Sequence, residues 1–574
     1  MFCSIVQKHT DMRLLITLLM IPFCAFSQMR DLESIFREKG EVYFSFCAES
    51  NEQLNTISRL VSIDHGSSLE NAHAYANQKE FGAFLDLDID YTIEENPGLT
   101  FKDLNMLLSL DQRQVNDWDF HPSYEVYIEM MYAFEEQYPE LCKVSSIGTS
   151  VNGRELLVAK ITDQLDVEEG EPRLLYTSSM HGDEITGYAL SLRLIDYLLT
   201  NYNTDTRVAE IVNNIEIWIN PLANPDGAYT NDNSTIYGAM RYNANWVDLN
   251  RNYPDPEDGD HPDGNSYQDE TFAFMAFADS CEFDMSSNFH AGAEVANYPW
   301  DTWSQYPADF DWWTHVMQEY ADTAQTYSNY NYFNSFDNGV TNGYDWYEVN
   351  GGRQDYMNYE KHCREFTLEL SDSKTPPGSQ LPYYWDANYN SLLAYLEQSL
   401  YGLRGIVIDS ISGAPLLAQI FIEGHDVDNS DVSSHLPIGD YHRYLASGSY
   451  DVIFSAEGYQ SKTVSAVGLM NNETTVLDVQ LVSSVVGLDE SLRNAISIYP
   501  NQSNQYFTIE FKDFESINSS ILLYDISGKL LFEQSLTESL NTIDLGHFSE
   551  GAYLYEILQN GAILKKDRLV KIER

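Results

Sequence analysis

Apolar strand-like runs alternate with helical patterns over residues 120 to 400, and this alternation constrains the fold more than any other feature of the chain. Leu174–Thr177 and Ile215–Ile219 are strand-like runs, whereas Gly187–Asn201 has the periodicity of an amphipathic helix. Strands that alternate with helices are typical of a sheet covered by helices. We therefore predict an α/β domain over residues 116–402.

The flanking segments predict three smaller domains. Residues 28–115 combine short strand-like runs with a helical interval, which indicates a small α/β domain. After residue 402, short strands are separated by Gly, Ser and Asn turns, first over residues 403–484 and then over residues 495–574. This pattern is typical of β-sandwich modules. The predicted linker between the two modules is Ser483–Asn494.

Residues 1–27 have the pattern of a cleaved export signal. Lys8 and Arg13 precede an apolar run, and Ala25 and Ser27 occupy the two positions that a signal peptidase inspects. No later stretch approaches the roughly 20 apolar residues that a membrane-spanning helix needs. We expect an exported chain without a transmembrane segment.

The charge of the chain excludes two classes of partner. Lys and Arg number 32 against 88 Asp and Glu, which gives a net charge of -56. A chain with no basic surplus cannot displace the counterions of nucleic acids, and it is not expected at an anionic membrane. The same charge favours cationic substrates through long-range attraction.

Four cysteines lie outside the predicted signal: Cys47, Cys142, Cys281 and Cys363. Export permits disulfides, and four cysteines allow three pairings. We expect occasional bridges or buried thiols.

A constellation of polar residues in the α/β domain indicates a metal site. His181 and Glu184 stand three positions apart between a predicted strand and a predicted helix, and His290 ends another strand-like run. Imidazole and carboxylate are ligands that Zn²⁺ prefers. Glu369 is an acid inside an apolar strand pattern, which is costly unless it has a partner or a function.

These motifs, with Asn220–Gly227 and Val247–Pro254 between them, resemble the zinc carboxypeptidases of the funnelin type, and most closely their regulatory branch, which removes C-terminal Lys or Arg. The resemblance covers roughly residues 120 to 400. It implies a mixed β-sheet flanked by helices, and peptide or protein C-termini as substrates.

Residue by residue, the resemblance implies a catalytic centre. His181, Glu184 and His290 match the three zinc ligands, with a water completing the site. Glu369 matches the general base and acid, and Arg241 matches the arginine that stabilises the tetrahedral oxyanion.

The resemblance also implies a substrate pocket. Asn250 and Arg251 match the pair that binds the terminal carboxylate, and Tyr347 matches the tyrosine that closes over it. Asp301 and Gln354 match the branch that selects basic ends. This sequence departs from the family pattern in having Arg353 where an apolar residue is usual, and a cation there would weaken a preference for basic ends.

Three further expectations concern the rest of the chain. The loop Asp255–Gly264 is rich in oxygen donors and is a possible Ca²⁺ site, although a solvated acidic loop is the simpler interpretation. Residues 28–115 loosely resemble carboxypeptidase pro-segments, which either cover the active site or pack elsewhere. Residues 403–484 resemble a transthyretin-like β-sandwich.

Residues 495–574 resemble the C-terminal sorting domain of the type IX secretion system. This resemblance implies outer-membrane secretion machinery as a partner and a secreted or cell-surface location. The prediction is thus a secreted zinc metallocarboxypeptidase. Two alternatives remain open: a peptidoglycan-peptide carboxypeptidase of the same fold, and a catalytically silent adhesion or binding protein.

Overall fold

The computed structural model describes residues 32–64, 67–110, 118–328, 331–484, 496–500, 502–512, 519–559 and 562–572. The predicted export signal and most of the predicted linker lie outside these residues. The chain divides into two compact units, residues 1–457 with 461–481, and residues 458–460 with 482–574. No helix of the described residues is long and apolar enough to cross a membrane.

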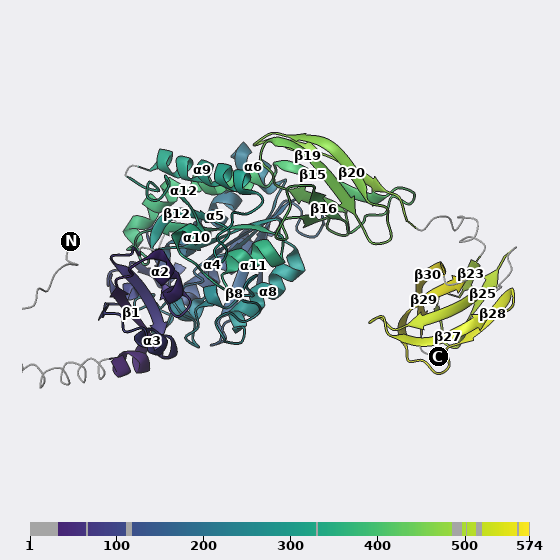
Figure 1. Cartoon of the computed structure of the whole chain (residues 1–574), viewed down its shortest axis with the longest axis horizontal. Helices are drawn as coiled ribbons and strands as arrows, with labels where there is room; N and C mark the ends of the chain where they lie inside the picture. The colour runs from purple at the N-terminus through teal and green to yellow at the C-terminus, as the bar shows by residue number, and fades with distance from the viewer. Residues whose placement is uncertain are drawn as a thin grey trace, which may run out of the picture. The chain divides into compact units, whose positions relative to one another are not determined.

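The centre of the first unit is an eight-stranded sheet with the order β13-β12-β14-β11-β9-β10-β8-β7 (Figure 1). β9, β10, β11 and β14 run parallel, whereas β8 pairs antiparallel with β7 and β10, and β12 pairs antiparallel with β14. The sheet is therefore mixed, as predicted. Its strands are β7 Cys142–Thr149, β8 Glu155–Ile161, β9 Arg173–Ser178, β10 Glu216–Asn220, β11 Met285–His290, β12 Ala293–Tyr298, β13 Val340–Asn342 and β14 Arg364–Ser371.

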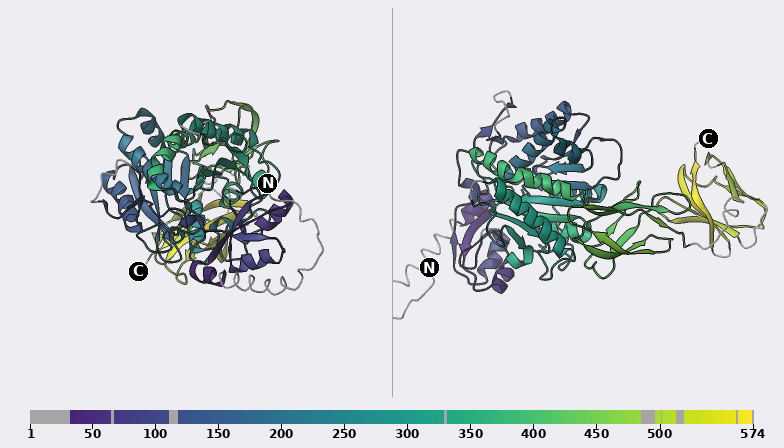
Figure 2. Two further views of the ribbon diagram at one scale, coloured as in Figure 1. Left: turned by 90° about the vertical axis from the view of Figure 1, so that its left-hand side faces the viewer. Right: turned by 90° about the horizontal axis from the view of Figure 1, so that it is seen from above.

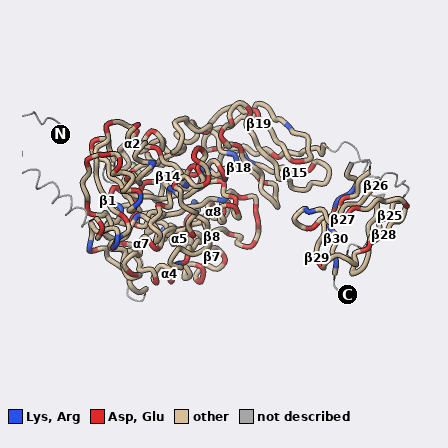
Figure 3. Tube along the Cα trace, turned by 60° about the horizontal axis from the view of Figure 1, so that its bottom comes forward, with Lys and Arg blue, Asp and Glu red and all other residues tan. Residues whose placement is uncertain are grey.

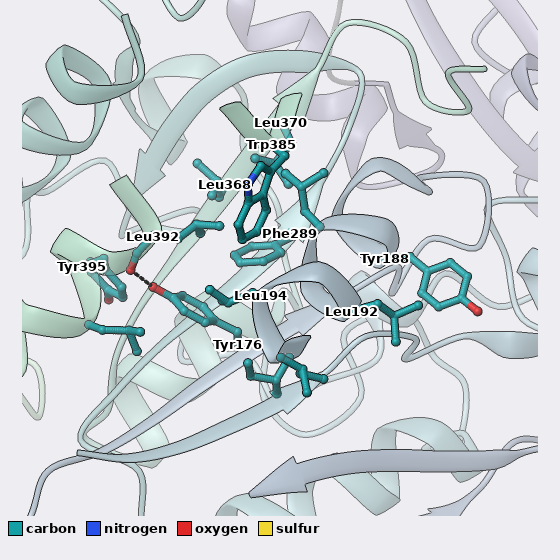
Figure 4. Packing of buried hydrophobic residues seen from close by; sticks show 14 of the residues in the cluster. Tyr176, Tyr188, Leu192, Leu194, Phe289, Leu368, Leu370, Trp385, Leu392 and Tyr395 are labelled. Atoms are coloured by element: carbon teal, nitrogen blue, oxygen red, sulfur yellow. Dashed lines mark hydrogen bonds between the residues drawn. The ribbon is translucent and has the colours of Figure 1, made fainter. Parts of the chain in front are cut away.

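Helices cover both faces of this sheet because successive strand residues point to opposite sides. In β9, Leu174 and Tyr176 pack in one core cluster and Leu175 packs in another. The larger cluster includes residues of six helices, and Figure 4 shows its packing around Tyr176, whose hydroxyl donates to the carbonyl of Leu392 at 2.8 Å. These helices are α4 Tyr124–Gln137, α5 Thr186–Asn201, α6 Thr206–Val212, α7 Pro225–Ala228, α9 Phe310–Tyr327 and α12 Leu381–Gln398. The other cluster includes residues of α8 Asp269–Cys281 and α11 Arg353–Glu360.

A small α/β module precedes this domain. Its four-stranded antiparallel sheet has the order β2-β3-β1-β4, and its helices are capped by Ser50 and by a capping box of Asn77 and Glu80. We call it the N-terminal module; its elements are β1 Glu41–Phe46, α2 Asn51–Ser58, β2 Ser62–Ile63, β3 Ala72–Asn77, α3 Gln78–Leu85 and β4 Tyr91–Ile93. It lies against the domain built around the eight-stranded sheet, within the first unit (Figure 2).

Two further modules are built of strands alone. The first has two sheets, β18-β15-β21 with β22 beside β15, and β17-β16-β19-β20. Its strands are β15 Gly402–Asp409, β16 Gln419–Ile422, β17 Val432–Ser433, β18 Asp440–Arg443, β19 Gly448–Ser455, β20 Lys462–Leu469, β21 Thr474–Val476 and β22 Val479–Leu481. Its transthyretin-like character stays a prediction.

The last module forms the second unit and has a core of its own. Its sheets have the orders β23-β25-β28 and β24-β30-β29-β26-β27. Its strands are β23 Ile496–Tyr499, β24 Gln502–Ser503, β25 Tyr506–Phe511, β26 Ser519–Tyr524, β27 Leu530–Leu536, β28 Leu540–Asp544, β29 Gly551–Gln559 and β30 Ala562–Lys571.

The four cysteines outside the predicted signal are free thiols. Cys142 and Cys363 are buried, Cys281 is half-buried and Cys47 is exposed. The expectation of buried thiols therefore holds for Cys142 and Cys363.

Candidate active site

His181, Glu184 and His290 converge on one point at the end of the central strands. His181 and Glu184 lie between β9 and α5, and His290 ends β11. Their ligand atoms all lie within 4.8 Å of one another: His290 Nδ1 is 3.0 Å from His181 Nδ1 and 2.8 Å from Glu184 Oε2. All three side chains are buried.

This donor set fits zinc. Zn²⁺ binds imidazole nitrogen and carboxylate oxygen at 2.0–2.2 Å, and two ligands of a tetrahedral ion therefore lie about 3.3 Å apart. The separations of 2.8, 3.0 and 3.1 Å between His181, Glu184 and His290 are close to that value. Two imidazoles and one carboxylate make up the three protein ligands of a catalytic zinc site, which leaves one further position for water or substrate.

Sheet register places Glu369 beside this cluster. In the parallel pair β11 and β14, His290 is opposite Glu369, so both residues reach the same end of the sheet. Glu369 is fully buried, and burial, together with the charge of Glu184, raises its pKa to about 8. A carboxyl group beside the His–Glu–His cluster is positioned to exchange protons with a group bound there.

Asp248 is a functional residue that the sequence reasoning missed. Its Oδ1 lies 3.0 Å from His181 Nε2, which leaves Nδ1 of that ring toward the cluster. A carboxylate on the distal nitrogen fixes the tautomer and orientation of a metal-binding histidine. Burial would raise the pKa of Asp248, but Arg241 and His181 hold it well below its usual range. Its position in the run Val247–Pro254 was the only available signal.

Arg241 reaches the same cluster from the loop before Asp248. Its Nε donates to Asp248 Oδ2 at 3.0 Å, and its Nη1 donates to Glu184 Oε1 at 3.4 Å. Its buried Nη2 has no hydrogen-bond partner among the described residues. A fixed guanidinium with a spare donor can stabilise developing negative charge.

Asn250 and Arg251 form a second cationic position. Both lie in a 3-10 turn, Leu249–Arg251, and Asn250 Oδ1 accepts from the backbone N–H of Arg353 at 2.9 Å. Arg251 Nη1 donates to the carbonyl of Asn250, whereas its buried Nε and Nη2 have no partner among the described residues. Two spare donors on one guanidinium suit a carboxylate.

Asp301 and Gln354 are in direct contact, and their role in selecting the terminal residue stays a prediction. Gln354 Nε2 donates to Asp301 Oδ1 at 2.9 Å. Burial raises the pKa of Asp301 to about 7, although Asn297 and the charge of Arg251 oppose this shift. Asp301 therefore lies within electrostatic range of the proposed carboxylate-binding arginine.

Arg353 is neutralised within the fold, which removes the reason for the expected weakening of a basic preference. Its Nη2 donates to Glu365 Oε2 at 3.1 Å and its Nη1 donates to Thr177 at 2.7 Å. The guanidinium also lies over the ring of Phe274. Its charge is thus paired with Glu365 inside the core.

The N-terminal module covers this site. Tyr347 belongs to the apolar core of that module, together with Val349, and is only 4% exposed. The Asp64 carboxylate lies 2.8 Å from Lys374 Nζ, and Lys374 Nζ lies 2.6 Å from Glu184 Oε1. Neither Asp64 nor Lys374 carried a motif in the sequence.

Polar contacts strengthen this cover. Ser62 donates to Asp248 at 2.6 Å, and the ring of Tyr75 lies under the cations of both Arg241 and Lys374. Glu41 accepts the backbone N–H of Arg241 at 3.2 Å. The His–Glu–His cluster, Glu369 and Arg241 are all at most 1% exposed. In this arrangement a peptide cannot reach them.

A cavity of about 480 Å³ remains at the boundary between the module and the catalytic domain. Ser58–Ser62 and Lys79 line it from the module, and Arg251 and Asn350 line it from the catalytic domain. The side chain expected to bind a terminal carboxylate therefore borders a space that the module helps to line.

In the loop Asp255–Gly264, the side chain of the first residue, Asp255, forms hydrogen bonds with backbone N–H groups. Asp255 Oδ1 accepts the backbone N–H groups of Glu257 and Asp258, and Oδ2 accepts that of Gly351. Across the described part of the chain, the groups of side chains that could hold a metal ion do not include this loop. A Ca²⁺ site there stays an untested prediction.

Two family models match the chain. The zinc carboxypeptidase model matches residues 127–391, and the model of the secretion system C-terminal sorting domain matches residues 497–571.

The chain is also similar to curated carboxypeptidases. It is 32% identical over 460 residues to human carboxypeptidase D, covering 76% of this chain and 32% of that one, so it spans about a third of that relative's length. It is 34% identical to the carboxypeptidase N catalytic chain of Mus musculus over 63% of this chain and 86% of the relative. Carboxypeptidase SOL1 of Arabidopsis thaliana is 34% identical, with 68% and 78% covered. Among solved structures, the carboxypeptidase A of Helicoverpa armigera superposes with a TM-score of 0.48 at 16% identity, covering 62% of this chain and 98% of that one.

Proposed function

The chain belongs to the zinc carboxypeptidase family, and from this premise we propose that it is an exported enzyme that removes the C-terminal residue of peptides and proteins, Lys or Arg by preference. The observation that carries the proposal is the placing of Glu369, by strand register, beside His181, Glu184 and His290. A binding protein has no need of such a set. The sorting domain over residues 497–571 indicates export to the cell surface or beyond.

We assign the chain's residues the following roles in hydrolysis. His181, Glu184 and His290 hold zinc, which when bound polarises the scissile carbonyl and activates water. Glu369 accepts a proton from the attacking water and returns one to the leaving amine. Arg241 donates to the oxyanion through its spare Nη2.

Selection of the terminal residue falls to a second group. Arg251 binds the terminal carboxylate through two parallel donors, which makes the enzyme an exopeptidase. Asp301 pairs with a basic side chain and penalises apolar ends. Acidic residues are spread over the first unit, whereas basic residues are fewer (Figure 3). This excess of negative charge would attract cationic peptides at long range.

We further propose that the N-terminal module inhibits the enzyme in the arrangement described. Asp64 pairs with Lys374 next to Glu184, and Tyr347 is held in the core of the module instead of closing over a substrate. Substrate therefore enters only after the module moves away or is removed.

The test is release of the last residue from peptides that differ only in ending with Arg, Lys, Phe or diaminopimelate. It uses the exported full-length chain and an Asp64→Asn variant, each with and without a zinc chelator. We expect chelator-sensitive release of Arg and Lys, faster in Asp64→Asn, and a loss of at least about a hundredfold in Glu369→Gln. Glu360→Gln, an exposed acid at the end of α11, is the matched control.

Each alternative has a distinct result. Selective release of diaminopimelate would favour the peptidoglycan-peptide enzyme. Preference for Phe would retain the mechanism and reject the role of Asp301. Absence of turnover in both forms, with zinc bound and even after limited proteolysis has removed the residues before about 115, would favour the silent binding protein.

A further inference from the structure

A second buried acid lies behind Asp301. Asp355 is in the first turn of α11, next to Gln354, and is fully buried. Its two carboxylate oxygens each accept from the backbone N–H of Asp301 at 3.0 Å, and Oδ2 also accepts from the backbone N–H of Thr302 at 2.8 Å. Asp355 thus fixes the backbone that carries Asp301, just beyond the end of β12.

The surroundings of Asp301 fix where its carboxylate lies. A Cβ on Gly343 would lie 1.8 Å from Asp301 Oδ1, so the carboxylate occupies space that only glycine leaves open. A Cβ on Gly352 would lie 3.5 Å from Asp301 Oδ2 and 3.7 Å from Asn250 Oδ1. One residue therefore separates Asp301 from the carboxylate-binding pair Asn250 and Arg251.

Several carboxylates lie near Asp301, and a cation among them would compensate their negative charge. Asp301 and Asp355 are buried together, and the carboxylate of Asp255 and that of Glu365 also act on Asp301. Burial, followed by the charge of Asp301, raises the pKa of Asp355 well above its usual range. Two carboxylates in one buried site resist joint ionisation unless a cation compensates them. The charge of Arg251 opposes the rise in the pKa of Asp301. In the proposed function, however, the spare donors of Arg251 bind the terminal carboxylate of the substrate.

We propose that Asp355 is a positioning residue for the selection of basic C-terminal residues. It holds the peptide N–H of Asp301 so that this carboxylate faces the terminal side chain, and it supplies the second negative charge that a guanidinium or ammonium group neutralises. The proposal rests on the proposed function, since it requires that Arg251 hold the last residue of the substrate.

The first test compares kinetics of full-length wild type and Asp355→Asn on two peptides that differ only in ending with Arg or Phe. We expect kcat/KM for the Arg peptide to fall about tenfold, mostly through KM, and that for the Phe peptide to change less than about threefold. Asp166→Asn, the same change at an exposed loop acid, should leave both unchanged. Equal losses on both peptides, which a merely structural role predicts, would overturn the proposal, as would no loss.

The second test needs no turnover. Free L-arginine should protect the wild-type chain against thermal unfolding more than L-norleucine does, and Asp355→Asn should lose this difference. An unchanged difference in the variant, or none in wild type, would contradict the proposal. Failure of the proposed function appears separately, as the absence of chelator-sensitive release from wild type even after limited proteolysis has removed the residues before about 115.

Discussion

Single residues at this site show how much depends on buried charge. Buried ionisable groups with shifted pKa values tend to gather at functional sites, because their desolvation costs free energy that no function offsets elsewhere. Glu369 and Asp301 could be predicted from motifs in the sequence. Asp248 and Lys374 could not, because each acts through a partner far along the chain: Asp248 on His181, and Lys374 on Asp64.

Gly343→Ala should reduce the preference for basic ends. Its new Cβ would overlap Asp301 Oδ1, so the carboxylate must turn away from the pocket. We expect the ratio of kcat/KM for Arg to Phe peptides to fall about tenfold or more, because small misplacements of a positioned group are costly. Gly468→Ala in β20, where a Cβ meets nothing within 4 Å, is the control. A retained ratio would contradict the position assigned to Asp301.

Asp301→Asn should change how stability depends on pH. The pKa of Asp301 is raised from 3.8 to about 7 in the folded chain, so between these values the folded state binds the proton that the unfolded state has lost. Stability therefore falls as pH rises from about 4 to about 7, by at most about 4 kcal/mol. The variant lacks this pH dependence. Its free energy of unfolding in urea, measured relative to that of wild type, should therefore be higher at pH 8 than at pH 5. Parallel curves at both pH values would contradict the shift.

At the scale of elements, strand register does most to assemble the site. Apolar runs identify β9 and β10 in the sequence, but the order β14-β11-β9 joins strands that lie far apart along the chain. Periodicity reports burial and says nothing of which strand is the neighbour. The pairing of His290 with Glu369 could therefore not be predicted from the pattern alone.

The N-terminal module should respond to loss of one helix cap. Asn77 caps α3, and its Nδ2 also donates to the carbonyl of Trp246 in the catalytic domain. Asn77→Ala should cost about 1 kcal/mol of stability in the module and raise peptide release. Thermal unfolding and turnover of the Arg peptide measure both effects. A less stable module without faster release would argue against inhibition by the module.

At the scale of the whole chain, a buried ion cluster joins the catalytic domain to the first β-sandwich. Asp309 forms ion pairs with Arg364 and with Arg443, each with an N···O separation of 2.8 Å. Arg443 also pairs with Asp426. The boundary near residue 403 could be predicted from the change to short strands and turns. The ion cluster could not, because its four members come from four separate segments of the chain.

Arg443→Ala should destabilise both domains together. It leaves Asp309 and Asp426 buried with less compensation, and removal of one partner of a buried pair typically costs about 3–5 kcal/mol. Calorimetry should show both domains unfolding at lower temperature, whereas Arg404→Ala, at a half-buried arginine of β15, should have a small effect. Independent unfolding of a stable β-sandwich would contradict this coupling.

Tyr347 and Val349 come from the domain of the eight-stranded sheet but pack in the core of the N-terminal module. A module that leaves takes with it neither of these side chains, so it loses part of its own interior and exposes apolar surface to water. A domain this small has little stability to spare. If the module detaches as proposed, it would therefore be less stable than in place and an easier target for proteases.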